Sequence, residues 1–302
     1  MDTGNFRAYL AWVAVCIVWG TTYLAIRIGV EHIPPMLFAG LRWIIAGIIF
    51  VSFLRLRGKK LPSKKELFHI SVVGISLIGI GNGLVVTGEQ YIGSGLAALL
   101  ITTVPFWVVG MEAFIPSGPK INLMILAGLF LGLMGVTLIF NGSWSELLNP
   151  SYLLGVVCIL GAVMAWSFGT VYSKYKKVSV HPLMRAAVQM LVAGTAQAIL
   201  GSFLGEWSRI SLHTDGLISF FYLVFIGSMF GYGSYIYAIE HLPLSLVSTY
   251  AYINPIIALF LGWLILDEKL NLPIIIAAVV IIIGVIIVKQ GAKRQKLSVN
   301  NH

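Results

Sequence analysis

A few ionisable side chains lie inside long apolar stretches, where a charge is costly and therefore indicates a functional role. Arg42 is the clearest, because it lies within the apolar stretch 35–55, about two helical turns from its start. Its guanidinium predicts a counter-charge for a substrate carboxylate or one half of an external gate. The alternatives are a structural ion pair with Glu89 and extension of the side chain toward lipid headgroups.

Two glutamates end apolar stretches at nearly matching places in the two halves of the chain. Glu89 follows the stretch 67–88, and Glu240 follows the stretch 216–238. Arg185 is placed to pair with Glu240 as Arg42 is with Glu89. Two such ion pairs on opposite faces would suit a protein that opens alternately to each side. The alternative is that both acids lie in the polar headgroup region.

Aromatic, hydroxyl and amide side chains recur at similar depths in several apolar stretches. A cavity lined by them favours amphipathic solutes, and cations through the ring faces. Aromatic side chains at this depth also serve in packing or as an interfacial belt. The amides Asn82 and Gln189 would contact substrate or join two helices by a hydrogen bond. The other candidates are Trp19, Tyr23, Thr103, Trp166, Tyr232, Tyr235, Ser248, Tyr252 and Asn254.

The elements that must position these residues are membrane-spanning helices. Apolar residues make up 58% of the 302 residues and charged residues only 10%, whereas soluble proteins carry about 25% charged residues. An all-α integral membrane protein is predicted, because a lipid-exposed backbone must satisfy its own hydrogen bonds. Ten stretches have roughly the 20 residues needed to cross a bilayer. They are 8–28, 35–55, 67–88, 92–112, 121–140, 151–173, 182–204, 216–238, 243–265 and 272–289.

The chain contains the same five-helix unit twice. Trp19 and Pro35 recur as Trp166 and Pro182, each 147 positions later. Because five is odd, the second unit enters the bilayer from the opposite side. We therefore predict two inverted five-helix repeats, 1–145 and 146–302, the second with a basic tail. Inverted repeats are typical of secondary transporters, whose substrate site lies between the repeats.

The net charge of +9 reflects membrane topology. With the amino terminus inside the cell, most lysines and arginines fall in cytoplasmic loops, as the positive-inside rule requires. Both termini are then cytoplasmic, and the basic loops would contact anionic lipids rather than nucleic acid. The six histidines lie at span ends, in loops or in the tail, so we predict no metal site and no cofactor. An intramembrane enzyme is disfavoured for the same reason, since no catalytic groups converge.

Several motifs are distributed over essentially the whole chain. They include Trp19-Gly-Thr-Thr-Tyr23, Gly81-Asn82-Gly83, Trp166-Ser-Phe-Gly-Thr170 and Ser248-Thr-Tyr-Ala-Tyr-Ile-Asn-Pro255. In these segments the chain resembles the drug/metabolite transporter superfamily, and more narrowly the EamA-type exporters of bacterial inner membranes. The resemblance implies a multi-pass inner-membrane protein with ten helices that exports metabolites or drugs. One departure is the acidic turn Asp267-Glu268-Lys269, which the first half replaces with Pro116-Ser-Gly-Pro-Lys120.

The sequence thus predicts a secondary transporter that exports small amphipathic metabolites or drugs, such as amino acids, purines or aromatic compounds, by alternating access. Coupling to protons stays open, as do an uncoupled facilitator and a lipid translocator of the same fold. A purely structural bundle would not need duplicated halves. Glycines such as Gly128 and Gly132, at a spacing that lets helices approach closely, would serve internal packing or a homodimer face.

Overall fold

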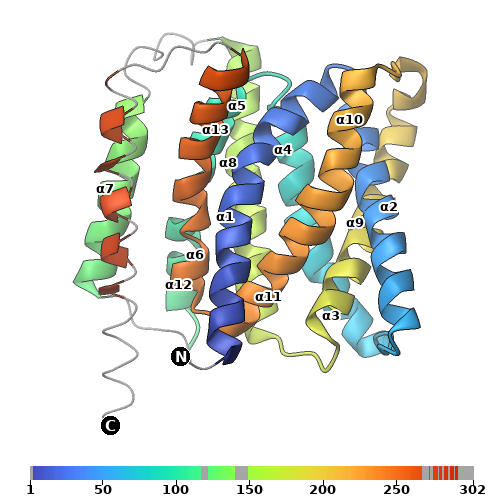
Figure 1. Cartoon of the computed structure of the whole chain (residues 1–302), viewed down its shortest axis with the longest axis horizontal. Helices are drawn as coiled ribbons and strands as arrows, with labels where there is room; N and C mark the ends of the chain where they lie inside the picture. Colours follow the sequence, from blue (N-terminus) through green and yellow to red (C-terminus); the bar gives the residue numbers. More distant parts are fainter. Residues whose placement is uncertain are drawn as a thin grey trace.

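A computed structural model describes residues 3–116, 122–139, 149–266, 272, 275–277, 279–280, 282–284, 286–288 and 290–291. These residues form helices joined by short connections, and none of them lies in a strand. The long helices stand side by side across the molecule (Figure 1). The boundary predicted between residues 145 and 146, the acidic turn Asp267-Glu268-Lys269 and the tail beyond residue 291 lie outside the described residues.

The helices follow one another in the same order in the two halves of the chain. In the first half they are α1 Thr3–Val30, α2 Pro35–Leu56, α3 Lys64–Gly74, η1 Ile75–Asn82, α4 Gly83–Gly88, α5 Ser94–Ile101, α6 Val104–Ala113 and α7 Leu123–Ile139. In the second half they are α8 Pro150–Tyr175, α9 Pro182–Phe203, η3 Glu206–Arg209, α10 Thr214–Tyr222, η4 Leu223–Tyr232, α11 Gly233–His241, α12 Leu244–Val247 and α13 Tyr250–Leu266.

Seven helices within the described residues are long and apolar enough to cross a membrane. They are Phe6–Val30, Pro35–Leu56, Lys64–Gly88, Pro150–Tyr175, Pro182–Phe203, Thr214–His241 and Leu244–Ile265. Three shorter apolar helices accompany them: Val104–Ala113, Leu123–Gly135 and Ile275–Val288.

Two of the predicted spans are interrupted at matching places. The span 92–112 breaks between α5 and α6, and the span 243–265 breaks between α12 and α13. At each break a threonine hydroxyl donates to the carbonyl three residues earlier: Thr103 to Leu100 at 2.8 Å, and Thr249 to Leu246 at 2.6 Å. A local side-chain bond of this kind competes with the helical ladder. The regular helix therefore stops and restarts inside each span.

The spans Lys64–Gly88 and Thr214–His241 each change into a π-helix, at η1 and η4. In both, a tryptophan from the other half of the chain packs on a glycine near the end of the π-helix. A Cβ atom on Gly81 would lie 3.2 Å from the Trp166 ring, and one on Gly231 would lie 2.7 Å from Nε1 of Trp19. These two glycines let the indole rings reach the helix backbones.

The two halves pack on each other in a reciprocal way. Helix α1 packs on α13, η4 and α11, while α8 packs on α6, η1 and α4. Helices α2 and α9 pack together through close backbone approaches at Gly40 and Gly194. A Cβ atom on Gly40 would lie 2.6 Å from the backbone nitrogen of Ala198, and one on Gly194 would lie 2.8 Å from that of Ile44.

Glycines also allow close packing between a helix at the end of the first half and one at the end of the second half. A Cβ atom on Gly128 would lie 2.8 Å from the carbonyl oxygen of Gly284, and one on Gly284 would lie 2.9 Å from the backbone nitrogen of Gly132. The internal-packing prediction for Gly128 and Gly132 is therefore confirmed.

Acidic side chains fix the starts of α2 and α9 at opposite ends of the molecule. Glu206 accepts hydrogen bonds from the backbone nitrogens of Met36 and Leu37, at 3.4 and 2.8 Å. Glu66 accepts one from the backbone nitrogen of Ser179, just before α9, at 2.9 Å. A carboxylate is favourable at a helix amino terminus, where backbone N–H groups lack partners.

Candidate functional site

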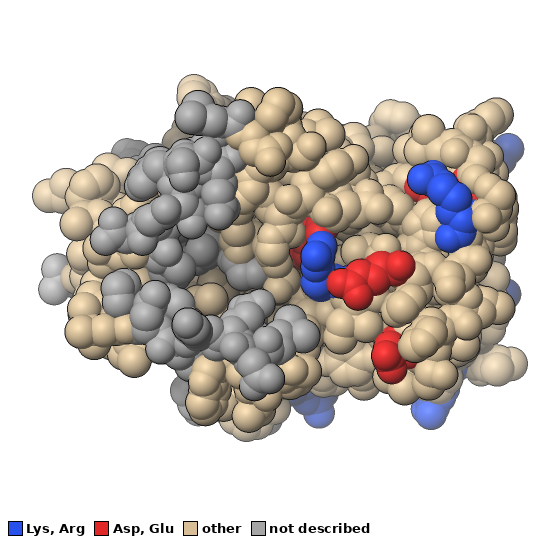
Figure 2. All heavy atoms as spheres, turned by 90° about the horizontal axis from the view of Figure 1, so that it is seen from above, with Lys and Arg blue, Asp and Glu red and all other residues tan. Residues whose placement is uncertain are grey.

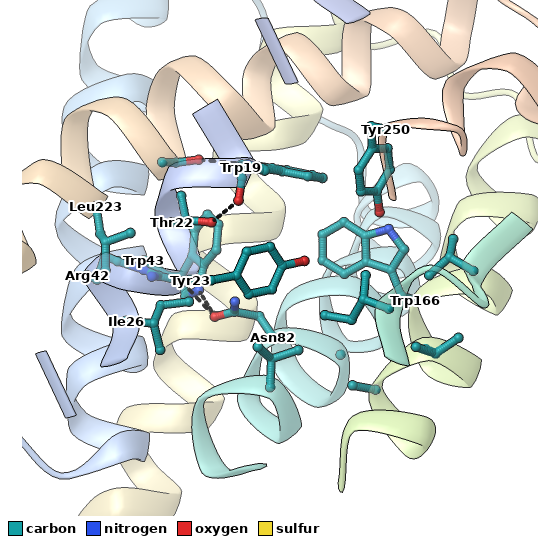
Figure 3. A pocket seen from close by; sticks show the side chains of 17 residues that line it. Trp19, Thr22, Tyr23, Ile26, Arg42, Trp43, Asn82, Trp166, Leu223 and Tyr250 are labelled. Atoms are coloured by element: carbon teal, nitrogen blue, oxygen red, sulfur yellow. Dashed lines mark hydrogen bonds between the residues drawn. The ribbon is translucent and has the colours of Figure 1, made fainter. Parts of the chain in front are cut away.

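A cavity of about 80 Å³ lies between helices of both halves (Figure 3). At the roughly 30 Å³ that each water occupies in the liquid, this volume holds about two or three waters. Its walls are mostly apolar and aromatic, with a few polar side chains. They are Trp19, Thr22, Tyr23, Ile26, Arg42, Trp43, Gly81, Asn82, Val85, Ile101, Val104, Ala162, Val163, Trp166, Leu223, Gly227 and Tyr250.

Aromatic rings from four helices meet at one end of the cavity. The rings of Trp19 and Trp166 lie edge to face with centroids 5.3 Å apart. Trp19 also lies 5.0 Å from Tyr235 and 5.1 Å from Tyr250. Its Nε1 donates to the carbonyl oxygen of Gly227 in the π-helix η4, at 3.2 Å. These contacts fix the ring of Trp19 in a single place between the two halves.

Arg42 brings a positive charge to the cavity wall although only 2% of the residue is exposed. Its Nη2 donates to Oδ1 of Asn82 at 2.7 Å, and the guanidinium lies 4.6 Å from the centroid of the Trp43 ring. Nε1 of Trp43 donates to the same oxygen of Asn82 at 2.9 Å (Figure 3). The side chain is thus held by an amide and a ring face, which leaves its charge uncompensated by these contacts.

The structure does not form the alternative ion pair between Arg42 and Glu89. Glu89 is fully buried, and both carboxylate oxygens lack a hydrogen-bond partner among the described residues. Arg27 reaches the backbone of Glu89 instead, and its Nη1 donates to the Glu89 carbonyl oxygen at 2.7 Å. Asn82 accepts the hydrogen bond of Arg42 in place of Glu89, the partner that the alternative interpretation gave it.

Next to the tryptophan pair, several buried side chains are joined by hydrogen bonds. Nε1 of Trp166 donates to the hydroxyl of Tyr235 at 3.1 Å, and that hydroxyl lies 2.5 Å from the hydroxyl of Thr170. The hydroxyl of Tyr232 donates to Oε1 of Gln189 at 2.8 Å. None of Tyr235, Thr170, Tyr232 and Gln189 lines the cavity, so a hydrogen-bonded layer lies next to the tryptophan pair. A second cavity of only about 10 Å³ lies beside Arg185 and Gln189.

The predicted partner of Glu240 is confirmed. Nη2 of Arg185, which lies on α9, is 2.5 Å from Oε2 of Glu240, on α11. The side chain of Arg185 is 8% exposed and that of Glu240 is 38% exposed. Next to this pair, Nζ of Lys174 donates to the carbonyl oxygens of Ile239 and Leu242, at 2.6 and 3.0 Å. Lys174 thus binds carbonyl oxygens at the carboxyl end of α11, as Arg27 does at the carboxyl end of α4.

The end of the molecule at which α1 finishes carries few charges among its described residues (Figure 2). Acidic and basic side chains meet near the middle of this face. The other end, with the start of α1 and the α2–α3 and α8–α9 connections (Figure 1), carries a basic cluster. Its members are Arg55, Arg57, Lys59, Lys60, Lys64, Lys65, Lys176 and Lys177.

Several predicted site residues lie away from the cavity walls. Thr103 and Ser248 lie at the two helix breaks, and each hydroxyl donates to the carbonyl three residues earlier. Tyr252 points to the far side of α13, where its ring packs on Gly132 of α7. Asn254 is buried beside Tyr23 and, with its amide nitrogen turned toward them, donates to the carbonyl oxygens of Cys16 and Tyr250. Any role of these residues in binding stays a prediction.

Sequence reasoning missed other residues that line the cavity. Trp43 and Tyr250 are aromatic and neighbour residues that were predicted, so ring type and helical spacing offered a signal for them. Val85 and Ala162 offered none, because an apolar residue that faces a cavity has the same sequence signature as one that faces lipid or core.

The fold and the site define a polytopic helical membrane protein with a buried, aromatic and polar cavity between its two halves. Comparison with known families then places the chain: it belongs to the EamA-like transporter family, which it matches over residues 6–141 and 153–289.

Curated relatives bear similar names. The chain is 34% identical to the uncharacterized inner membrane transporter YedA of Escherichia coli K12, over 93% of this chain and 90% of that protein. It is 29% identical to the uncharacterized transporter YoaV of Bacillus subtilis, over 92% of this chain and 95% of that protein. It is 24% identical to a probable amino-acid metabolite efflux pump of E. coli K12, over 93% of this chain and 94% of that protein. The chain is accordingly a multi-pass inner-membrane transporter.

A solved structure shares the fold. A crystal structure that is 20% identical in sequence aligns with a TM-score of 0.77, over 95% of this chain and 98% of that one.

Proposed function

We propose that this transporter exports small amphipathic metabolites by alternating access between its two halves. The observation that supports it most is the position of the cavity, which both halves line and which lies next to a hydrogen-bonded layer of buried side chains. A carrier that opens alternately to each side needs a site between its two halves and a layer that closes one side of it.

We also propose ten membrane helices in two inverted repeats. Reciprocal packing supports the inverted relation, because α1 contacts the helices of the second half that correspond to those that α8 contacts in the first. The matched π-helices η1 and η4 support it as well. The basic cluster at the end where α1 begins supports a cytoplasmic amino terminus, and with ten helices the carboxyl terminus is also cytoplasmic.

The substrate class follows from the character of the cavity. Its small volume and apolar walls suit a small solute, and Arg42 with Asn82 suit a polar group on that solute. Amino acids are one class of candidate, because one relative is named a probable amino-acid metabolite efflux pump.

Solute counterflow in proteoliposomes tests the proposal. We expect saturable exchange of at least one member of a panel of amino acids, purines, aromatic metabolites and cationic dyes. Exchange that a pH gradient drives would establish proton coupling, and exchange indifferent to the gradient would establish a facilitator. Absence of flux for every solute, with lipid scrambling instead, would replace the proposal with a lipid translocator.

The ion pair between Arg185 and Glu240 is expected to act as a latch that closes the cytoplasmic side. Arg185→Glu and Glu240→Arg should each lower counterflow at least about tenfold, because each places two like charges in a partly buried site. The double reversal should restore most of the flux.

Counterflow at equal protein amount measures this, and Asp215→Asn is the control. Asp215 forms a pair with His213 in which both side chains are more than half exposed, so its loss should change little. A double reversal that folds and stays as inactive as the single variants would contradict the latch.

A further inference from the structure

We infer that Arg42 forms a carboxylate subsite within this cavity, and that the preferred solutes are small aliphatic monocarboxylates. This inference rests on the proposed function and narrows it to one chemical class. It is carried by a buried guanidinium on the cavity wall that keeps an unused donor.

The first step concerns the hydrogen bonds of Arg42. A guanidinium has five N–H donors and no acceptor. Within the described part of the chain, Nη2 donates to Asn82, while Nε is buried and has no partner. Nε is shielded even from a water-sized probe, so a carboxylate in the cavity would meet the terminal nitrogens of the guanidinium. A planar carboxylate satisfies two guanidinium donors at once.

The second step concerns charge. Arg42 is the only charged side chain among the described residues that line the cavity. Asn82 and the Trp43 ring orient the guanidinium without neutralising it. No carboxylate oxygen of Glu89 lies within ion-pair distance of it. Glu89 acts on Arg42 electrostatically from beyond that distance, and Glu89 is not among the residues that line the cavity. An anionic solute would place a negative charge in direct contact with the guanidinium, in a site with little water.

The third step concerns what the cavity cannot hold well. The acceptor nearest the guanidinium, Oδ1 of Asn82, already receives hydrogen bonds from Arg42 and from Trp43. None of the described lining residues carries a carboxylate that could bind an ammonium group. The positive charge of Arg42 also repels a cation, so a carboxylate should bind better than an amine of the same shape.

The fourth step concerns size. The cavity of about 80 Å³ is smaller than the engineered cavity of about 150 Å³ that takes up benzene. Apolar groups such as Ile26, Val85 and Val104 line it beside the aromatic rings. A short branched aliphatic body therefore fits better than an aromatic ring.

The other half of the chain carries a neutral counterpart of this subsite. Gln189 stands 147 positions after Arg42, and Tyr232 stands 150 positions after Asn82, which are the offsets of the repeat. The hydrogen bond between Tyr232 and Gln189 thus joins the counterparts of Asn82 and Arg42, with donor and acceptor exchanged. Only the Arg42 side offers a charge, so a carboxylate has one anchoring point rather than two.

A binding series on the purified full-length protein tests the subsite. Quenching of tryptophan fluorescence reports occupancy, because Trp19, Trp43 and Trp166 line the cavity. The probes are 3-methylbutanoate, 3-methylbutanamide, 2-methylpropylamine and valine, which share a branched body and differ in charge. We expect the carboxylate to bind at least about tenfold more tightly than the amide or the amine.

Three variants locate the effect. Arg42→Gln should weaken binding of 3-methylbutanoate at least about tenfold and leave the amide within about twofold. Asn82→Asp keeps the acceptor for Arg42 and Trp43 but adds a carboxylate to the site, so it should also weaken carboxylate binding, in a protein that retains Arg42. Arg209→Gln is the matched control, because Arg209 is exposed and lies outside the cavity.

Equal affinity of the wild-type protein for the carboxylate and the amide would overturn the subsite. It would also be overturned if neither of these two probes bound. Unchanged carboxylate affinity in Arg42→Gln or in Asn82→Asp would do the same. Counterflow of the neutral amide separates this failure from failure of the proposed function. If the amide is exchanged and the carboxylate is exchanged no better, the proposal of transport is retained and the carboxylate subsite is rejected.

Discussion

Gly40→Ala is expected to destabilise the protein by more than about 2 kcal/mol and to lower the yield of folded protein in the membrane. The Cβ atom would lie 2.6 Å from the backbone nitrogen and 2.9 Å from the Cα atom of Ala198. Neither backbone atom can move aside without shifting α9 as a whole. Helices α2 and α9 would have to separate, and each loses part of its contact with the other.

Thermal unfolding in detergent measures the change, and Gly110→Ala is the control. Gly110 also lies in an apolar helix, but outside its own helix backbone no atom of the described residues would lie within 4 Å of a Cβ atom placed there. Alanine at that position should be neutral or stabilising, since it favours the helix by up to about 1 kcal/mol over glycine. We expect the midpoint of Gly40→Ala to fall at least about 5 °C below that of Gly110→Ala. Equal midpoints would show that α2 and α9 do not depend on this close approach.

Trp19→Ala is expected to reduce counterflow at least about tenfold while the amount of folded protein stays within about twofold. The ring of Trp19 contacts Trp166, Tyr235 and Tyr250, and its Nε1 bonds the carbonyl oxygen of Gly227. Each aromatic contact contributes about 0.5–1.5 kcal/mol beyond burial, and about 1.4 kcal/mol corresponds to a factor of ten. Its loss would remove one ring from the aromatic wall of the cavity and would leave the Gly227 carbonyl in η4 without this hydrogen bond.

Counterflow normalised to folded protein measures this effect. Trp107→Ala is the control, because Trp107 is 39% exposed and lies outside the cavity. Trp19→Phe should keep part of the flux, since it retains a ring but loses the bond to Gly227. Equal losses of flux and of folded protein in Trp19→Ala would assign the ring to packing alone.

Local patterns predicted some features of the site. Trp19, Tyr23, Arg42, Asn82 and Trp166 were predicted from their residue type and depth, and all five line the cavity. The pairing of Arg185 with Glu240 followed from opposite charges at the ends of two apolar stretches. These predictions succeeded because a polar or ionisable group inside hydrocarbon is costly and so stands out in a sequence.

Other features depended on contacts between distant segments. Arg42 pairs with Asn82 rather than with Glu89, although a charge-based argument favours the acid. Tyr252 was predicted to face the substrate, but it packs on Gly132 of α7. A single helix has several faces, and the sequence alone does not say which face meets which neighbour.

The sequence by itself determined that this protein is a multi-pass helical membrane protein of the EamA-like transporter family, because composition, repeat offsets and motifs are properties of the chain alone. The tertiary structure decided which of the candidate residues share a cavity, that Tyr232 and Gln189 lie outside it, and that Arg42 bonds Asn82 on its wall. The physical reason is that these properties arise from side chains far apart in the sequence. Their distances and hydrogen bonds are set only when the two halves pack together.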